Sequence, residues 1–460
     1  MRRLIAAIGV LGFLASACLS GGGAETRSIL VDFNTDQFTS FFAHNFPDNV
    51  AVHPGDLVVF RQTWTGEPHT VTGGTSVDRI MSKATLWFPF FKAYDGLRAA
   101  GVDLPDPNGK PPSVSTADVL NMVEASKPSK LRTQFNTYYD LLLAAGAPLP
   151  ARARAASVPF AKTIQNVNDV TNKLFSSLLS FDNSNTFAQN LGQPCFLKTG
   201  EPPRSADKPC SKRHRRQPLF DGKASFYSSG IIPYAGAQGN TYEIHLAKNI
   251  KPGHYFFYCE VHGPGMSEEI TVRPNGSKIP SQADVSRAAQ SQVSDLAVPL
   301  LKRLREAQRG TFAVNGTTLS GPFAGIGDPS IQGSVNEFVP KSFTTRVGQP
   351  VTWTIVGASH SISFDVPKYF PIIRFAKSGE VSTNPRLYRP YGGSPKVPDA
   401  NNGEILRVDG GTYSGRGFFS SSVFGSDPYA TYTLRFSKPG TYPYACLIHP
   451  GMVGKLVVKP

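Results

Sequence analysis

The stretch KPGHYFFYCEVHGPGMSEEITVRP at residues 251–274 returns at residues 438–460 as KPGTYPYACLIHPGMVGKLVVKP. The two stretches keep the same order and differ by one residue between their histidine and methionine. In each, a strand-like run ends on a cysteine, a histidine follows three positions later, a methionine closes a turn, and a second strand-like run begins. The repeated residues are Cys259, His262 and Met266, and Cys446, His449 and Met452.

A thiolate, an imidazole and a thioether on one short loop form a soft ligand set that suits copper. A blue copper site needs two imidazoles and a thiolate in a plane, with a weak axial methionine, so each loop lacks one histidine. The segment EPHTVTGG provides His69, and TIVGASHSISF provides His360. Each lies after a glycine-containing turn and an alternating run with a tryptophan, which is typical of a strand. We therefore predict two four-ligand sites: His69, Cys259, His262 and Met266, and His360, Cys446, His449 and Met452.

This ensemble resembles the cupredoxins, the family of plastocyanin, pseudoazurin and amicyanin. The loop CLIHPGM has amicyanin-like ligand spacing, and the first loop is one residue longer, between amicyanin and plastocyanin. The resemblance covers roughly residues 45–75, 219–274 and 332–460. It implies a mainly β fold with two Greek-key β-sandwich domains. It also implies that His262 and His449 expose an imidazole edge as the port for electrons.

Packing alone is a weak explanation for the two patterns. A single histidine after a strand is usually a surface residue, and a single methionine usually fills a core. The chain has five methionines, however, and two of them stand at matching positions beside a cysteine and a histidine. The other histidines have no such pattern, and we interpret them as surface or strand residues: His44, His53, His214, His245 and His254.

The N-terminus MRRLIAAIGVLGFLASACLSGGG has a basic start, an apolar run and small residues before Cys18, as in an export signal. The apolar run is too short for a comfortable membrane span. ASAC followed by SGGG resembles a bacterial lipoprotein signal with a lipidated Cys18. Because Ala15 stands where such signals usually have leucine, ordinary cleavage after ASA stays open. We expect residues 1–24 to be signal and tether, and the protein to be periplasmic or at the cell surface, attached to the membrane through Cys18.

Of the five cysteines, Cys195 and Cys210 remain unassigned, in a loop rich in proline, lysine and arginine. An exported chain meets an oxidising compartment, so we predict a disulfide between them. The formal net charge of +14 is densest at KRHRR, 212–216, and KRLR, 302–305. These clusters indicate docking to an acidic redox partner or to anionic lipid, or simply a solvated face. An exported chain without an interleaved aromatic motif is not expected to bind nucleic acid.

The spacing of the ligands predicts the domains. His69 and Cys259 are much farther apart in sequence than His360 and Cys446, and the excess, at about 75–218, shows helix-like apolar spacing. We predict a first cupredoxin domain at 25–276 with this helical insertion, a helical linker at 277–309, and a second domain at 310–460. Pro299 makes the linker either a kinked helix or two shorter ones. We expect loop and edge strand at 310–331, and ordered surface loops at 365–425.

The neighbours of the cysteines argue against an enzyme. Multicopper oxidases and copper nitrite reductases place histidines beside the copper cysteine, whereas Cys259 lies between Tyr258 and Glu260, and no His-x-His occurs. The leading prediction is electron transfer at two type 1 copper sites. One alternative is copper storage, delivery or sensing without rapid redox cycling, although the chain lacks Met-rich or His-rich segments. Another is a cell-surface interaction protein with structural copper.

Overall fold

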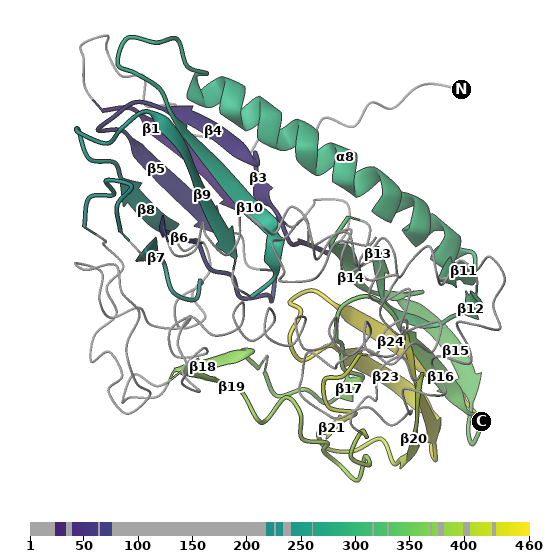
Figure 1. The fold of residues 1–460 in the computed structure, drawn as a ribbon. Coiled ribbons are helices and arrows are strands. Elements are labelled where there is room, and N and C mark those ends of the chain that lie inside the picture. Colours follow the sequence, from purple (N-terminus) through teal and green to yellow (C-terminus); the bar gives the residue numbers. More distant parts are fainter. Residues whose placement is uncertain are drawn as a thin grey trace, which may run out of the picture.

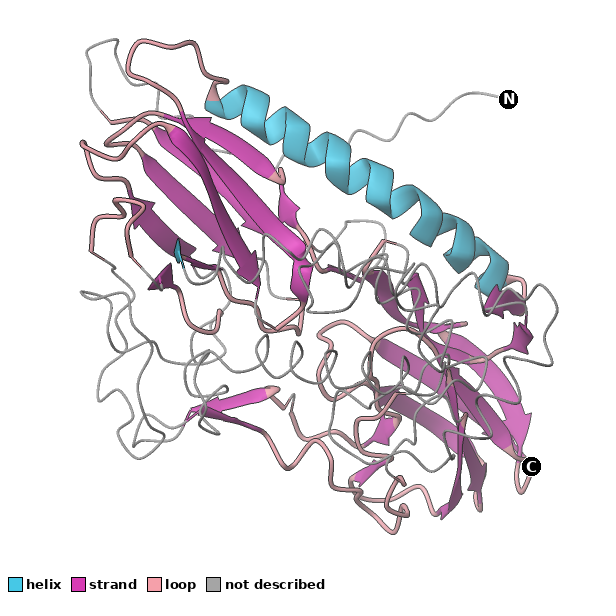
Figure 2. Cartoon of the chain, in the orientation of Figure 1, coloured by secondary structure: helices cyan, strands magenta, loops and turns pink. Residues whose placement is uncertain are grey.

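Over the residues that it describes, the computed structural model is mainly β, with two β-sandwiches and one long helix (Figures 1 and 2). The predicted insertion from residue 76 to 217, the signal through residue 23, and the Cys195–Cys210 pair lie outside the described residues. The expectations for these segments therefore stay predictions. The described residues are 24–33, 39–62, 65–75, 218–224, 227–232, 241–259, 261–314, 317–328, 331–368, 370–375, 381–398, 405–425 and 429–460.

The first sandwich packs a four-stranded sheet against a five-stranded sheet. Buried residues alternate with more exposed ones in strand β1, where Arg27, Ile29 and Val31 are buried, because successive side chains point to opposite faces. One sheet has the order β3 (Asn45–Phe46), β1 (Thr26–Val31), β5 (Leu57–Gln62) and β8 (Thr241–His245). The other has the order β4 (Asn49–Val52), β10 (Gly263–Val272), β9 (Gly253–Cys259), β6 (Thr72–Gly73) and β7 (Tyr227–Ser228).

The second sandwich packs a six-stranded sheet against a five-stranded one around Trp353, which is fully buried. The first sheet has the order β2 (Ser40–Phe42), β14 (Gly333–Val339), β13 (Phe323–Asp328), β16 (Val351–Ile355), β22 (Ala430–Phe436) and β20 (Leu406–Tyr413). The other has the order β15 (Ser342–Arg346), β24 (Val453–Lys459), β23 (Gly440–Ala445), β17 (Ser363–Phe364) and β21 (Phe419–Ser420). Two small ribbons pair β11 (Thr311–Val314) with β12 (Thr317–Ser320), and β18 (Ile373–Phe375) with β19 (Val381–Thr383).

The strand pairing is duplicated between the two sandwiches. The parallel pairs β1–β5 and β4–β10 of the first correspond to β13–β16 and β15–β24 of the second. The hairpin β9–β10 corresponds to the hairpin β23–β24. The first strand of each hairpin also pairs with a short strand, β9 with β6 and β23 with β17. The predicted fold class, mainly β with two sandwiches, is confirmed.

Helix α8 (Gln282–Gln308) joins the sandwiches and lies along both. It begins with a capping box in which Ser281 and Asp284 satisfy each other's backbone N–H groups. One continuous helix runs through Pro299, so it is not two shorter helices. Its buried face packs on both halves and consists of Val285, Ala289, Val293, Leu300, Leu304 and Ala307. Within the described ranges, no helix has both the length and the apolarity to cross a membrane.

The N-terminal segment also ties the halves together, because β2 pairs with β14 in the sheet of the second sandwich. The expected loop and edge strand at 310–331 is wrong in part, since β13 lies inside that sheet, between β14 and β16. The glycines of β13 allow His360 to pack closely against this strand, because a Cβ on Gly325 would overlap Nε2 of His360. The surface loops expected at 365–425 also contain β20, a strand of eight residues at the edge of the sheet.

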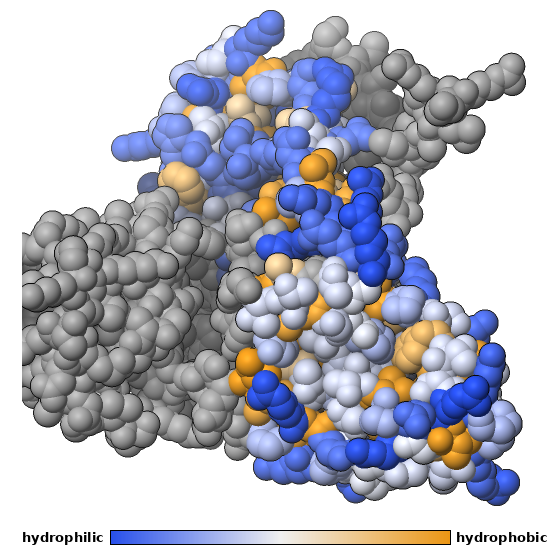
Figure 3. All heavy atoms as spheres, turned by 90° about the vertical axis from the view of Figure 1, so that its right-hand side faces the viewer, coloured by the Kyte–Doolittle hydropathy of each residue, from blue (hydrophilic) through white to orange (hydrophobic). Residues whose placement is uncertain are grey.

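The described surface carries isolated hydrophobic side chains. On the face in Figure 3, hydrophobic residues are interspersed with hydrophilic ones over the second sandwich. Scattered exposed apolar residues are normal for a folded protein and define no docking patch. The large ones are Leu219, Val261, Val298, Tyr388 and Val453.

Candidate metal centres

The first centre lies where the end of β9 meets the segment before β6. Nδ1 of His69 is 3.9 Å from Sγ of Cys259, and Nδ1 of His262 is 3.5 Å from the same sulfur. His69 is positioned by a two-way backbone bridge with Ile232. Met266 is fully buried in the same core cluster as Cys259.

The second centre repeats this arrangement at the end of β23. Nδ1 of His360 and of His449 lie 4.0 and 3.6 Å from Sγ of Cys446. Met452 closes the turn, because its N–H donates to the carbonyl of His449 and its carbonyl accepts from the N–H of Cys446. All four side chains are fully buried.

In each centre the two imidazole nitrogens and the sulfur lie within 4.8 Å of one another. The structure thus gathers the six predicted histidine and cysteine ligands into two groups and buries both predicted methionines. One thiolate and two imidazoles fit copper, a metal that soft sulfur and imidazole ligands favour. Nδ1 faces the sulfur in all four histidines, which leaves Nε2 for a partner outside the centre, as metal-bound histidines usually have.

Behind each thiolate lies the same network of hydroxyl groups. In the first half, Oγ1 of Thr72 lies 3.1 Å from Oγ1 of Thr70 and 2.8 Å from Oγ of Ser228, and the N–H of Val71 donates to Oγ of Ser229 at 2.9 Å. In the second half, the corresponding distances are 2.9, 2.8 and 2.9 Å. The network fixes the strand after the upstream histidine, β6 or β17, to its neighbour β7 or β21. Its members in the second half are Ser361, Ser363, Ser420, Ser421 and the N–H of Ile362.

The sequence carries a signal for this network outside the ligand loops. HTVT at 69–72 matches HSIS at 360–363, and YSSG at 227–230 matches FSSS at 419–422. The first pair places hydroxyl residues one and three positions after the upstream histidine, and the second pair places two serines in succession after an aromatic residue. A search for repeats beyond the ligand loops would have found it.

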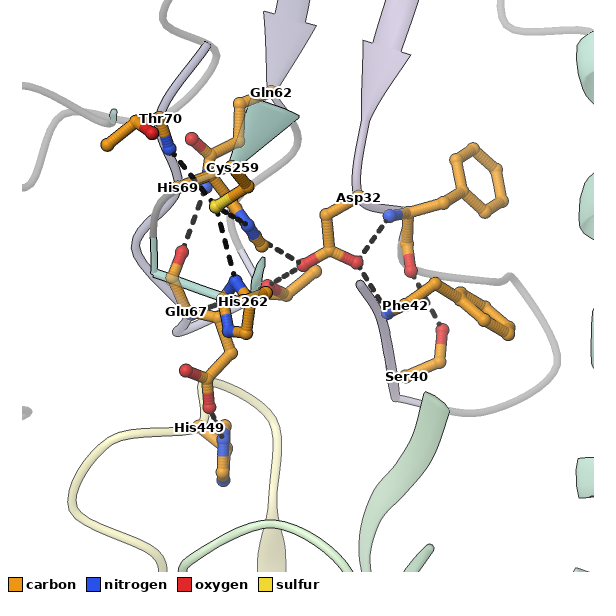
Figure 4. Close-up of polar contacts among 12 residues, drawn as sticks. Asp32, Ser40, Phe42, Gln62, Glu67, His69, Thr70, Cys259, His262 and His449 are labelled. Carbon is orange, nitrogen blue, oxygen red and sulfur yellow. Dashed lines mark hydrogen bonds and ion pairs between the residues drawn. The ribbon is translucent and has the colours of Figure 1, made fainter. Parts of the chain in front are cut away.

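Asp32 is a carboxylate near the first centre that stands in no sequence motif. It is fully buried, and its Oδ2 lies 3.1 Å from Nε2 of His69 and 2.5 Å from the hydroxyl of Thr65 (Figure 4). Its Oδ1 accepts from the N–H of Phe42 at 2.7 Å. Burial raises the pKa of Asp32 to about 8 against the lowering effect of these hydrogen bonds. A cation beside His69 would favour the charged carboxylate.

Glu67 is the second unexpected carboxylate, and it contacts the other half. Its Oε1 lies 2.9 Å from Nε2 of His449, and because a carboxylate can only accept, Nε2 donates. Burial would raise the pKa of Glu67, but the hydrogen bond and charge of His449 outweigh it and hold the pKa at about 2.

Protonation differs between the centres. Burial lowers the pKa of His69 to about 3 and of His262 to about 4, so both imidazoles are neutral and ready to bind a metal. At the second centre, burial would lower the pKa of His449, but the Cys446 thiolate and Glu67 raise it to about 10. Burial opposes ionisation of Cys446, yet His449 and His360 hold the pKa of this thiol well below its ordinary value. Without metal, these shifts favour a thiolate–imidazolium pair at the second centre.

The expectation of an exposed imidazole edge on His449 is wrong. This side chain is fully buried, because the segment around Gly66 and Glu67 of the first half covers it. A Cβ on Gly66 would lie 2.5 Å from the carbonyl oxygen of Ile448 and 2.9 Å from Cδ2 of His449. His262 keeps partial exposure beside Val261, which is 40% exposed.

The remaining histidines in the described ranges belong to neither centre. His44 and His53 lie within hydrogen-bond distance of backbone carbonyls, at Ile331 and Ser277. The other two lie beside surface carboxylates and are His245, with Glu243, and His254, with Glu269. His214 lies outside the described residues.

Comparison with known proteins adds little to this description. No protein-family model and no curated protein matches the chain. Among solved structures, a Cu(I) methionine-to-glutamine mutant of amicyanin is 19% identical, with 27% of this chain and 73% of that chain covered and a TM-score of 0.15. A reduced Cu(I) proline-to-glycine mutant at pH 4 is 17% identical, with 32% and 91% covered and a TM-score of 0.15.

The fold assignment rests on the strands themselves. Each half is a two-sheet sandwich whose Cys–His–Met loop joins two strands of an antiparallel hairpin, with a second histidine just before the neighbouring strand. This arrangement defines a cupredoxin-like fold.

Proposed function

We propose that the chain is an exported copper-binding protein that carries single electrons at two type 1 copper centres, one in each half. The observation that supports this most strongly is the duplicated donor set, one thiolate and two Nδ1 atoms within 4.8 Å in each half. Bound copper would supply a one-electron couple between Cu(I) and Cu(II).

The residues of the chain contribute rigidity and exclusion of water. The cysteines are fully buried, and each follows or ends a strand paired on both sides. The hydroxyl networks fix the segment after each upstream histidine to a neighbouring strand, β7 or β21. Ligands held in place by packing and hydrogen bonds keep one geometry through a redox cycle, which favours fast electron exchange.

Burial also disfavours storage or delivery, the main alternative. A delivery site must release its metal to a partner, whereas His69, His360 and His449 are fully buried. We do not propose catalysis, because no histidine stands beside either cysteine. The neighbouring residues are Tyr258, Glu260, Ala445 and Leu447.

For compartment and partner, we propose export, attachment through lipidated Cys18, and exchange of electrons with an acidic redox protein. The signal-like N-terminus and the net charge of +14 support these proposals. Intact-mass analysis of the mature protein would show the lipid, and transfer to an acidic partner should slow as salt screens the attraction.

The deciding experiment counts copper per chain and records visible and electron paramagnetic resonance spectra. We expect two coppers and intense thiolate-to-copper absorption. A chain that binds copper without this absorption, or binds none, would refute type 1 centres. Measured self-exchange rates then separate a carrier from a store, because a store has no need of fast exchange.

A further inference from the structure

The outer edge of the second centre is closed by a residue of the first half. Nε2 of His449 donates to Oε1 of Glu67 at 2.9 Å, and the two side chains are 0% and 15% exposed. Figure 4 shows Glu67 reaching from the first centre to His449 on the loop of the second half. A partner protein therefore has no access to this imidazole edge.

Glu67 belongs to the ligand segment of the first centre. It lies two residues before His69, and its carbonyl accepts from Nε2 of Gln62 at 2.9 Å. Thr65, two residues earlier, donates to Asp32, which in turn binds His69. The segment 65–69 is thus held from both sides and contacts both centres.

The two centres obtain their outer carboxylates differently. The first uses Asp32 of its own half, whereas the second uses Glu67 of the other half. The outer histidines also differ, because His262 is partly exposed and His449 is buried. The first centre is therefore the accessible one.

We propose that Glu67 is the positioning residue that joins the two centres: it holds His449 and provides the contact through which an electron passes between them, while outside partners exchange electrons at the first centre through His262. This inference rests on the proposed function. The electron moves from one copper to the other, so that one is oxidised from Cu(I) to Cu(II) and the other reduced from Cu(II) to Cu(I). No external oxidant and no proton transfer is needed.

The path between His69 and His449 suits this role because all of its links except one are covalent bonds. From His69 the path follows two residues of backbone to the Glu67 side chain, and a single hydrogen bond completes it to His449. A hydrogen bond to an ionised carboxylate is shorter and stronger than a neutral one. A hydrogen-bond acceptor on the outer nitrogen of a metal-bound histidine orients the imidazole and raises its basicity.

The test compares Glu67→Ala, which removes the acceptor, with Glu67→Gln, which keeps an acceptor oxygen and removes the charge. Glu243→Ala is the matched control, because Glu243 is a half-exposed glutamate of the same sandwich, bonded only to His245 in the described structure. The fully oxidised, copper-loaded protein receives less than one electron per chain by pulse radiolysis. Freeze-quenched electron paramagnetic resonance then follows redistribution between the centres, whose signals are assigned from Cys259→Ser and Cys446→Ser proteins.

We expect a redistribution phase whose rate is independent of protein concentration. Glu67→Ala should slow this phase by about 10- to 100-fold, the range for loss of the hydrogen-bond partner of a metal ligand, and Glu67→Gln should slow it less. Loss of copper from the second centre alone in Glu67→Ala would support the positioning role, and Glu67→Gln would then carry the rate comparison.

Two outcomes would overturn the inference in distinguishable ways. If both coppers are bound with intense absorption and all variants redistribute electrons at the wild-type rate, Glu67 does not join the centres and the proposed function stands. If the wild-type protein shows no thiolate-to-copper absorption, the proposed function fails and this inference fails with it.

Discussion

Gly66→Ala tests whether the contact between the halves shapes the second centre. Gly66 has φ +106°, and a Cβ there would lie 2.5 Å from the carbonyl oxygen of Ile448 and 2.9 Å from Cδ2 of His449. Backbone atoms at such a distance cannot move aside without shifting the loop that carries His449. The substitution should therefore separate the first half from the ligand loop of the second.

Two costs add up. The left-handed backbone costs a non-glycine residue about 1–2 kcal/mol, and overpacking a well-packed contact typically costs about 1–3 kcal/mol. Gly276→Ala separates them, because Gly276 has φ +81° and nothing within 4 Å of its added Cβ. We expect roughly 1–2 kcal/mol of destabilisation in Gly276→Ala and about 2–5 kcal/mol in Gly66→Ala.

The assay is urea unfolding of both variants, followed by circular dichroism and by the thiolate-to-copper absorption of the second centre. Gly66→Ala should lower the unfolding midpoint more than Gly276→Ala and shift the second-centre spectrum. Equal midpoints and an unchanged spectrum in the two variants would refute a tight contact between the segment around Gly66 and His449.

Three further results are expected. Cys259→Ser and Cys446→Ser should each abolish one of two thiolate-to-copper absorptions, and a variant that loses both would show that the centres do not form independently. Met266→Leu and Met452→Leu should keep copper and change the reduction potential of the altered centre, because the axial bond is weak; loss of copper would make methionine a principal ligand. Copper uptake by the second centre should release about one proton at neutral pH, because metal displaces a proton from a histidine whose pKa is about 10. The apparent copper affinity of the second centre should therefore rise with pH up to about 10. A copper titration of the Cys259→Ser protein that releases no proton would contradict the thiolate–imidazolium pair.

The ligands could be predicted because they follow from local structure. Cys259, His262 and Met266 lie on one hairpin, where short-range spacing decides which side chains meet. The upstream histidines were found because the same pattern occurs twice. Trp353 and the alternating strands likewise predict a sandwich, since their periodicity reflects one buried face.

The outer contacts could not be predicted, because they depend on how two halves pack. Glu67 and His449 are separated by 382 residues, and neither stands in a motif that points to the other. The expectation of an exposed His449 came from resemblance to isolated domains, in which no second sandwich covers the imidazole. Asp32 lies 37 residues before His69, outside any ligand pattern, and its role follows only from the buried cluster around it.

Comparison of the halves separates the positions that make a centre from those that distinguish one centre from the other. The ligands and the hydroxyl network behind each thiolate are of the same kind in both halves, with nearly equal distances. The groups that face the outer Nε2 atoms are different. Oδ2 of Asp32 lies 3.1 Å from Nε2 of His69, whereas Nε2 of His360 has no hydrogen-bond partner among the described residues and packs against Gly325, whose missing Cβ leaves it room. Since outer partners tune a metal-bound imidazole, two centres with the same ligands but different outer partners should have different potentials, which gives an electron moving between them a preferred direction.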